Sequence, residues 1–424
     1  MKLKTRRILY ILTILLFLGV TPVLLAFGFG IRYNPDSKSI VKTGGIYINT
    51  FPKNLTISLD GKTSQEKTPL RMRSLWPKIY TLDISKNGYY SLQTTIDIQQ
   101  SQVFLFDPIE LIPQQPINEV SVQSEQYFAS PFGPQLLLFS KDFDGTFSAS
   151  YFEVNEKKNI FGKLSHRPTK VFWNGETGDA LIDTETGQYM YTANKETIIA
   201  LPTNFTHAVL AAKDPGMVYG FVDNKTFIFN SSDKTTTASS VSGAVVYKHN
   251  GLFAVFTDAN GTSTLSIQNG NDSTVIQTLP EVLSITTFSK QYALIECSRE
   301  TYLLDAANKK LLYLDSSISA YTLSREALYY ANGFEVWKLD IATSEKALVN
   351  RFSDKIDSLS VSPHESGLFI HSLDKTLFWY LRTQKQTSVQ IDGLGLVQRV
   401  DDTHFQSLTN KTEGDVSIRT YVIE

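Results

Sequence analysis

The sequence predicts an all-β protein behind one N-terminal transmembrane helix: a small antiparallel, β-sandwich-like domain, then a β-propeller of eight blades, with seven as the alternative. Three observations predict it: an apolar run at residues 8–31, a short alternating pattern after it, and a strand-like repeat of about 38 residues from residue 127 onward. Such a repeat is typical of radially stacked four-stranded blades. The predicted organisation is a basic cytoplasmic tail at 1–7, a transmembrane helix at 8–31, a linker at 32–43, a β-domain at 44–107, a linker at 108–117 and a propeller at 118–424.

The apolar run is interrupted mainly by Thr13, Thr21 and Pro22. A helix of about 20 apolar residues crosses the hydrocarbon core of a bilayer, whereas the apolar part of a secretory signal has only about 7 to 15. A proline inside such a helix is tolerated. We therefore expect a retained signal-anchor, with cleavage at the small residues of 26–28 as the alternative.

Basic residues flank the apolar run unequally. Lys2, Lys4, Arg6 and Arg7 precede it, whereas Arg32 alone follows closely. The more basic side of a single membrane helix stays in the cytoplasm. The sequence thus predicts a single-pass cell-membrane protein, with a cytoplasmic N-terminus and the bulk of the chain extracytoplasmic.

Residues 44–107 alternate apolar and polar positions in runs that end at Pro, Asp-Gly or Asn-Gly turns, which predicts a small antiparallel β-domain. Its marker residues follow in the order Gly45, Pro52, Asp60-Gly61, Thr68-Pro69, Leu75, Pro77 and Gly88-Tyr89. This order resembles the PEGA domain, a β-module of envelope proteins. The namesake tetrad reads Pro-Lys-Asn-Leu at 52–55 here, and Lys78 replaces a usual glycine. The resemblance implies an extracytoplasmic domain that adheres or spaces, and it brings no catalytic residue.

Each unit of the repeat opens with a short apolar strand, and after a longer first step the openings follow one another at intervals of 38, 37, 39, 36, 38 and 38 residues. The eight predicted opening strands begin near Tyr127, Val171, Val209, Val246, Ile285, Tyr321, Leu359 and Val397. Further short strands follow in each unit, with a polar turn after the third. The last unit has only about three strands, so we expect residues 118–123 to supply its fourth and to close the ring.

Charge and cysteine content bear on which functions are possible. The 40 basic and 42 acidic residues are dispersed, so there is no concentrated basic face of the kind that binds nucleic acid. Cys297 is the single cysteine and therefore forms no intrachain disulfide. Because it ends an apolar strand, we interpret it as a buried structural thiol rather than a nucleophile.

No motif predicts a catalytic or metal centre. The chain has neither a Gly-x-Ser-x-Gly elbow nor a phosphate-binding glycine loop. Two acidic turns, 142–145 and 258–263, lack the later Glu of a calcium loop, so we interpret them as hairpin turns. The histidines form no paired metal motif and are interpreted as turn or surface residues: His166, His207, His249, His364, His371 and His404. Seven Asn-x-Ser/Thr sites are interpreted as turn chemistry: Asn54, Asn204, Asn224, Asn230, Asn260, Asn271 and Asn410.

These features favour a non-catalytic surface module over an enzyme. The helix would tether the chain, and the propeller would present loops to an envelope protein or glycan. The alternative is a propeller enzyme, a glycoside hydrolase or peptidase-like protein that acts on cell-wall material, with acidic residues gathered at the channel. Acids from different units that could meet there are Asp183, Asp223, Glu296, Glu335 and Asp374. The sequence gives no ground for choosing among them, so we name no catalytic, cofactor-binding or metal-binding residue and expect no cofactor.

Overall fold

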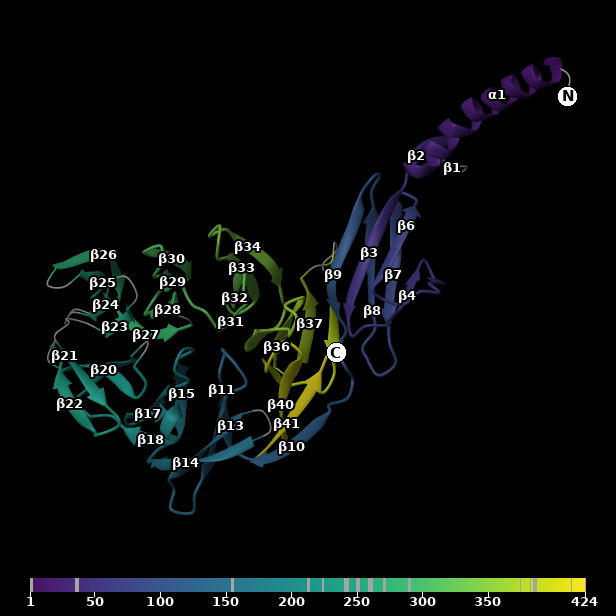
Figure 1. Cartoon of the computed structure of the whole chain (residues 1–424). Coiled ribbons are helices and arrows are strands. Elements are labelled where there is room, and N and C mark those ends of the chain that lie inside the picture. The colour runs from purple at the N-terminus through teal and green to yellow at the C-terminus, as the bar shows by residue number, and fades with distance from the viewer. Residues whose placement is uncertain are drawn as a thin grey trace. The chain divides into compact units, whose positions relative to one another are not determined.

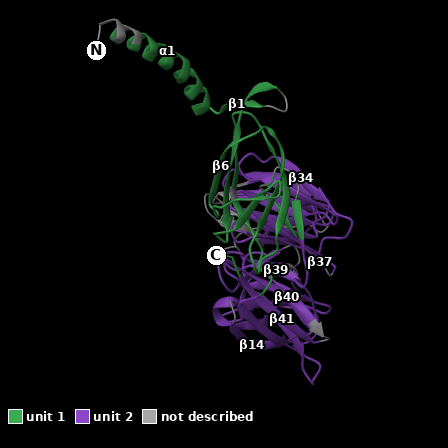
Figure 2. Cartoon of the chain, turned by 90° about the vertical axis from the view of Figure 1, so that its right-hand side faces the viewer, with its two compact units in different colours: residues 1–115, 378–389, 422–424 green, residues 116–377, 390–421 purple. Residues whose placement is uncertain are grey.

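The computed structural model describes residues 3–34, 38–153, 156–211, 214–222, 225–239, 244–248, 252–257, 262–269, 272–288, 291–373, 375–381, 383, 387–412 and 414–423, and the structural statements below concern these residues. The chain forms two compact units, shown in separate colours in Figure 2. Unit 1 comprises residues 1–115, 378–389 and 422–424, and unit 2 comprises residues 116–377 and 390–421.

The N-terminal apolar run forms the helix α1 (Leu3–Gly28), and its residues Leu9–Gly28 are long and apolar enough to cross a membrane (Figure 1). Thr13 Oγ1 donates a hydrogen bond to the carbonyl of Leu9 at 2.9 Å, which satisfies the hydroxyl group within the helix. The antiparallel hairpin of β1 (Ile31–Asn34) and β2 (Ser39–Lys42) follows at once.

The next seven strands of unit 1 form two sheets, as the sandwich-like prediction required. One sheet has the order β6-β3-β9, made of β6 (Leu70–Leu75), β3 (Gly44–Phe51) and β9 (Val103–Glu110). The other has the order β5-β4-β7-β8, made of β5 (Lys62–Thr63), β4 (Thr56–Leu59), β7 (Lys78–Ser85) and β8 (Leu92–Ile98). Alternate residues point into the core between the sheets, and Ile48, Leu82 and Ile96 are fully buried.

One strand pair of this domain departs from the antiparallel prediction. β3 and β9 run parallel, with Ile46 opposite Phe104. A parallel pair needs a long crossover connection between its two strands. The prediction paired each strand with the next one along the chain and so contained no such connection. Here the five strands β4 to β8 form that connection.

The repeat region consists of short strands in groups of four, and all eight predicted opening strands are confirmed as the first strand of a group. These first strands are β11 (Gln126–Ala129), β15 (Pro168–Trp173), β19 (Thr206–Leu210), β23 (Ala244–Lys248), β27 (Val282–Thr287), β31 (Ala320–Leu323), β35 (Ser358–Val361) and β39 (Leu396–Arg399). They are the innermost strands of a propeller-type array, and each begins an antiparallel meander.

The remaining strands complete the meanders in chain order. They are β12 (Leu136–Lys141), β13 (Phe147–Glu153), β14 (Glu156–Leu164), β16 (Ala180–Thr184), β17 (Gln188–Thr192), β18 (Thr197–Ala200), β20 (Met217–Val222), β21 (Lys225–Asn230), β22 (Thr235–Ala238), β24 (Leu252–Thr257), β25 (Thr262–Asn269), β26 (Asp272–Pro280), β28 (Tyr292–Cys297), β29 (Thr301–Asp305), β30 (Lys310–Asp315), β32 (Ala327–Ala331), β33 (Glu335–Asp340), β34 (Lys346–Arg351), β36 (Gly367–Ser372), β37 (Lys375–Tyr380), β38 (Thr387–Ile391), β40 (His404–Thr412) and β41 (Asp415–Val422). A 3-10 turn (Ala193–Lys195) precedes β18.

The predicted closing strand is confirmed. β10 (Asn118–Gln123) pairs antiparallel with β41, from Asn118 opposite Thr420 to Gln123 opposite Asp415, and completes the sheet β10-β41-β40-β39. Among the described strands, the groups β11–β14 and β15–β18 share one sheet through a single parallel pair, Phe161 opposite Thr197. The eight strands β11–β18 therefore form one sheet rather than two separate four-stranded blades. For this reason the count of eight blades stays a prediction.

Candidate ligand-binding channel

A cavity of about 560 Å³ lies within unit 2, and its wall is made largely by the first strands of six groups: β11, β15, β27, β31, β35 and β39. Innermost strands face the axis of a propeller, so residues far apart in the sequence converge there. The volume is within the range of about 300 to 1,000 Å³ that is common for small-ligand sites. We call this cavity the channel.

Aromatic rings form part of the channel wall. Phe132 and Tyr321 line the channel, and the ring of Phe288 lies 5.4 Å from the first and 5.3 Å from the second. Burial raises the pKa of Tyr127 and, together with the charge of Glu296, that of Tyr321. Both phenols are therefore neutral at physiological pH, and the hydroxyl group of Tyr321 is hydrogen-bonded to Thr286.

The charged groups of the wall have partners within the protein. Lys170 Nζ lies 3.5 Å from Glu296 Oε2, and the hydroxyl group of Ser284 donates a hydrogen bond to the same carboxylate. Asp357 Oδ2 accepts a hydrogen bond from the backbone N–H of Leu373 at 2.8 Å. These pairings leave the wall polar, with its charges balanced.

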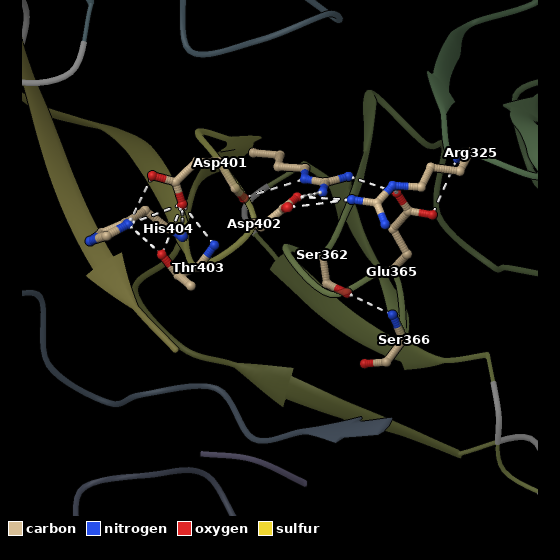
Figure 3. A network of polar contacts seen from close by, with 9 residues as sticks. Arg325, Ser362, Glu365, Ser366, Asp401, Asp402, Thr403 and His404 are labelled. Carbon is tan, nitrogen blue, oxygen red and sulfur yellow. Dashed lines mark hydrogen bonds and ion pairs between the residues drawn. The ribbon is translucent and has the colours of Figure 1, made fainter. Parts of the chain in front are cut away.

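A charged network extends from the wall along the loops that follow three successive first strands (Figure 3). Arg399, which lines the channel, lies 3.0 Å from Glu365 Oε1 and 2.5 Å from Asp402 Oδ1. Arg325 lies 3.3 Å from the same Asp402 oxygen and 3.6 Å from the same Glu365 oxygen. Two arginines and two carboxylates thus join the loops that follow β31, β35 and β39.

A neighbouring turn in Figure 3 is held by Asp401. Its Oδ1 accepts hydrogen bonds from the backbone N–H groups of Thr403 and His404, both at 2.7 Å. Burial alone would raise the pKa of Asp401, but hydrogen bonds from the backbone and side chains of Thr403 and His404 outweigh it and bring that pKa to about 2. The carboxylate therefore stays ionised and fixes the turn beside Asp402.

The two arginines of the network predict unequal effects on stability. Arg399→Ala leaves Glu365, whose side chain is only 15% exposed, without its closest cation. Lost hydrogen bonds to a charged group cost about 1.5–3 kcal/mol each, so we expect a decrease of that order in the free energy of unfolding, measured by urea denaturation. Arg325 is 72% exposed, and Arg325→Ala should cost less than about 1 kcal/mol. Equal losses in the two variants would contradict the assigned roles.

Within the described residues, two buried polar atoms of channel-lining side chains have no hydrogen-bond partner in the protein: Trp173 Nε1 and Gln398 Oε1. The other end of the Gln398 amide is well used, since Nε2 donates to the carbonyls of Ser130, Gly133 and Gln135 at 2.9, 3.1 and 3.2 Å. A buried donor without a partner costs free energy, about 1–3 kcal/mol.

The unpartnered N–H group of Trp173 predicts that Trp173→Phe is less destabilising than the same change at the more exposed Trp337. In Trp173→Phe, the loss of packing is offset by the removal of the unpaired N–H group. In Trp337→Phe, the change removes a hydrogen bond of 3.0 Å from Nε1 to Glu335 Oε2 on the outer strand β33. We therefore expect Trp337→Phe to lower the thermal unfolding midpoint more, although Trp173 is the more buried residue. Calorimetry of the two variants tests this order, and the reverse order would contradict it.

The three described acids of the set proposed from the sequence do not all line the channel. Glu296 alone among the described members lines the channel. Asp183 lies on β16 beside a separate cavity of about 30 Å³ and accepts a hydrogen bond from Gln188 at 2.8 Å, while Glu335 pairs with Arg351 at 2.6 Å on an outer strand. Asp223 and Asp374 lie outside the described residues.

The charged network was missed because its members come from three repeat units. One signal was available: Arg325, Glu365 and Asp402 each lie between the first and second strands of their units. Loops in equivalent positions of a repeat emerge on the same side of the array, so comparing them position by position would have grouped these residues.

The turn at 142–145 is confirmed as a hairpin between β12 and β13. The ammonium of Lys163 lies 2.7 Å from Asp142 and 3.3 Å from Asp144, where a cation would have to bind. The hydrogen bonds of Thr146 hold the pKa of Asp144 at about 2. The turn at 258–261 lies outside the described residues.

The single cysteine is buried, as predicted. Burial raises the pKa of Cys297 to about 12, so the thiol stays protonated. Within the described residues, no group of three or more His, Cys, Asp or Glu side chains is arranged to hold a metal.

Two other interpretations need correction. His371 lies on strand β36, half-buried, with Nδ1 2.9 Å from Thr376 Oγ1, so it is not a turn residue. Asn410 lies within strand β40 and not in a turn. A residue type that is common in turns does not by itself show whether a strand runs through its position. His249, Asn224, Asn260 and Asn271, and the side chain of His207, lie outside the described part of the chain.

Comparison with known families supports the assignment of the first β-domain. Residues 43–110 match the PEGA domain model, so this part of the chain is a PEGA domain. No curated protein matches the chain.

Among solved structures, similar ones include Saccharomyces cerevisiae Sqt1, with 11% identity, 73% of this chain and 100% of that chain covered, and a TM-score of 0.45. The β-propeller domain of Cps50 (Swd1) from Myceliophteria thermophila has 12% identity, 74% and 100% coverage, and a TM-score of 0.38. PorZ, a surface component of the type-IX secretion system of Porphyromonas gingivalis, has 10% identity, 68% and 42% coverage, and a TM-score of 0.36.

Proposed function

We propose that this chain is a membrane-anchored, extracytoplasmic binding protein whose propeller takes up part of an envelope protein or glycan in its channel, without catalysing a reaction. The observation that carries the proposal is the channel itself, a cavity of about 560 Å³ whose wall comes from the first strands of six groups. The apolar helix α1 and the PEGA domain support the envelope location.

The character of the wall indicates which part of a partner enters. Aromatic rings and hydroxyl groups are available, whereas Lys170, Glu296, Asp357 and Arg399 already bond within the protein. A strongly charged ligand would have to compete with these existing pairs for each charged group of the wall. We therefore expect the channel to prefer an uncharged ligand segment.

A cavity-filling substitution tests the proposal. The full chain is reconstituted in lipid nanodiscs and its retention on purified envelope material is measured. Ala320 lines the channel, and Ala320→Trp is expected to abolish retention. Ala238→Trp, at an exposed position on the outer strand β22, is the matched control and should bind like the unmodified chain. If both variants fold and bind equally well, the channel is not the binding site.

One observation favours the enzyme alternative: two carboxylates, Glu296 and Asp357, line the same cavity. Glycoside hydrolases act through such a pair. The retention experiment therefore includes an assay for released sugars and peptides. Product release that disappears in Glu296→Gln and Asp357→Asn would replace the binding proposal with an enzymatic one.

A further inference from the structure

The hairpin of β1 and β2 begins and ends at the C-terminus of α1. The backbone N–H of Phe29 donates to Leu25 O at 2.9 Å, so the last helical turn continues into the hairpin. The N–H and the hydroxyl group of Thr43 then donate to Gly30 O at 2.8 and 3.0 Å. These bonds hold both ends of the hairpin at the point where the apolar helix stops.

Large apolar side chains of this segment lie on its surface. Tyr33 and Ile40 are directly opposite each other in the strand pair and are 63% and 73% exposed, and Phe29 is 74% exposed. An exposed aromatic and aliphatic pair on a two-stranded hairpin is costly in water.

The charge of the segment is positive. Residues 29–43 contain Arg32, Lys38 and Lys42 against one acidic residue, Asp36. The guanidinium of Arg32 lies 3.6 Å from the centre of the Phe27 ring, over the last turn of α1. Basic and aromatic side chains next to an apolar helix are the combination that anchors proteins at the boundary between lipid acyl chains and headgroups.

We infer that the β1–β2 hairpin binds the lipid surface, with Tyr33 and Ile40 at the boundary between acyl chains and headgroups and the basic side chains near lipid phosphates. The inference rests on the proposed membrane anchoring of α1, because only an embedded helix holds the hairpin at the depth of the headgroups. A lipid surface fits better than a protein partner because the exposed pair is continuous with the helix that enters the bilayer.

Spin labels on single cysteines test the inference in the full chain, reconstituted in nanodiscs of phosphatidylcholine and phosphatidylglycerol. The natural Cys297 is buried and protonated, so it does not compete for the label. The variants are Leu16→Cys in the middle of α1, Ile40→Cys in the hairpin, and Ile79→Cys on β7. Ile79 is a matched control because it is an isoleucine of similar exposure, 67%, in the PEGA domain.

The readout is the accessibility of each label to oxygen, which concentrates in lipid, and to a water-soluble nickel chelate. We expect the label at 16 to be deep in lipid, the label at 40 to lie at the boundary, within about 5–10 Å of the headgroups, and the label at 79 to be in water. Adding Tyr33→Ser should move the label at 40 toward water.

If the label at 16 is in lipid while those at 40 and 79 are equally accessible to the chelate, the hairpin inference is overturned and the anchor stands. If the label at 16 is itself in water, the anchoring part of the proposed function fails as well.

Discussion

Val122→Asp is expected to open the ring. Val122 is 5% exposed and packs with Leu136, Leu138, Val416 and Ile418, where β10 meets β41 and the next group. A carboxylate placed there loses its hydration without gaining a partner, which we expect to cost at least about 3 kcal/mol. Release of β10 would also leave the edge of β41 unpaired, a site for aggregation. Urea denaturation followed by circular dichroism measures the loss, and size-exclusion chromatography measures the aggregation.

The first residue of the same strand provides the control. Asn118 has an exposed side chain and lies opposite the uncharged Thr420, so Asn118→Asp adds the same charge without burying it. We expect its unfolding midpoint to stay close to that of the unmodified chain. If Val122→Asp is equally stable, β10 does not close the ring in solution.

Asp179→Ala is expected to have the second large effect. Asp179 is 2% exposed, and its two carboxylate oxygens accept hydrogen bonds from the backbone N–H groups of Ala193 at 2.9 Å and Gly216 at 2.8 Å. The second bond joins the group β15–β18 to the group β19–β22. Because each of the two bonds to a charged acceptor contributes about 1.5–3 kcal/mol, we expect a total loss of about 3–6 kcal/mol in the free energy of unfolding.

The matched control for this change is Asp233→Ala, which removes an exposed carboxylate from the turn after β21, where it accepts a bond from Thr235. Its unfolding curve should be close to that of the unmodified chain. Similar losses in the two variants would show that the bonds of Asp179 do not hold neighbouring groups together.

Comparison with the conservative variant Asp179→Asn shows how the contribution of Asp179 to stability depends on pH. Burial raises the pKa of Asp179 above 3.8, against the smaller opposing effects of the Gly216 and Ala193 bonds. The folded state therefore binds the proton more tightly than the unfolded state does. The stability advantage of the unmodified chain over Asp179→Asn should be greatest below pH 3.8 and should decrease as the pH rises through the folded-state pKa. An advantage that grows with pH would contradict this assignment.

The sequence predicted the features that depend on neighbouring residues. Alternation within each short strand and a constant interval between units placed all eight opening strands, and the incomplete last unit pointed to β10. The parallel pairing of β3 with β9 was missed because nothing local distinguishes a strand that pairs with its neighbour from one that pairs across five others.

The parallel pair of Phe161 and Thr197, which joins two groups in one sheet, was also missed. The adjacent Gly162 is a residue that this pairing requires. This glycine has φ +112, and a Cβ there would lie 2.3 Å from the carbonyl oxygen of Ile198. Only glycine fits such a close approach of two backbones. In the sequence alone, however, it is one glycine among 24.

The site was harder to predict than the fold for a related reason. Glu296 is visible as an acid in the sequence. Its place on the channel wall, however, depends on how the groups are arranged around the propeller axis. The cation that neutralises it, Lys170, comes from β15 in another group, whereas Ser284 lies directly opposite it in the β27–β28 pair. Convergence of this kind is a property of the assembled ring.

The position of β10 determines how the protein carries mechanical force. With α1 embedded as proposed, the chain runs from the membrane through the PEGA domain directly into β10, the strand that closes the ring. Along the covalent chain, tension between the cell and a ligand held in the channel as proposed would reach the propeller at the six residue pairs that join β10 to β41. Antiparallel strands separate pair by pair or shear together depending on the direction of the pull. We therefore expect the β10–β41 pairing to separate first under load, and its strength to set the force at which a tethered ligand is released.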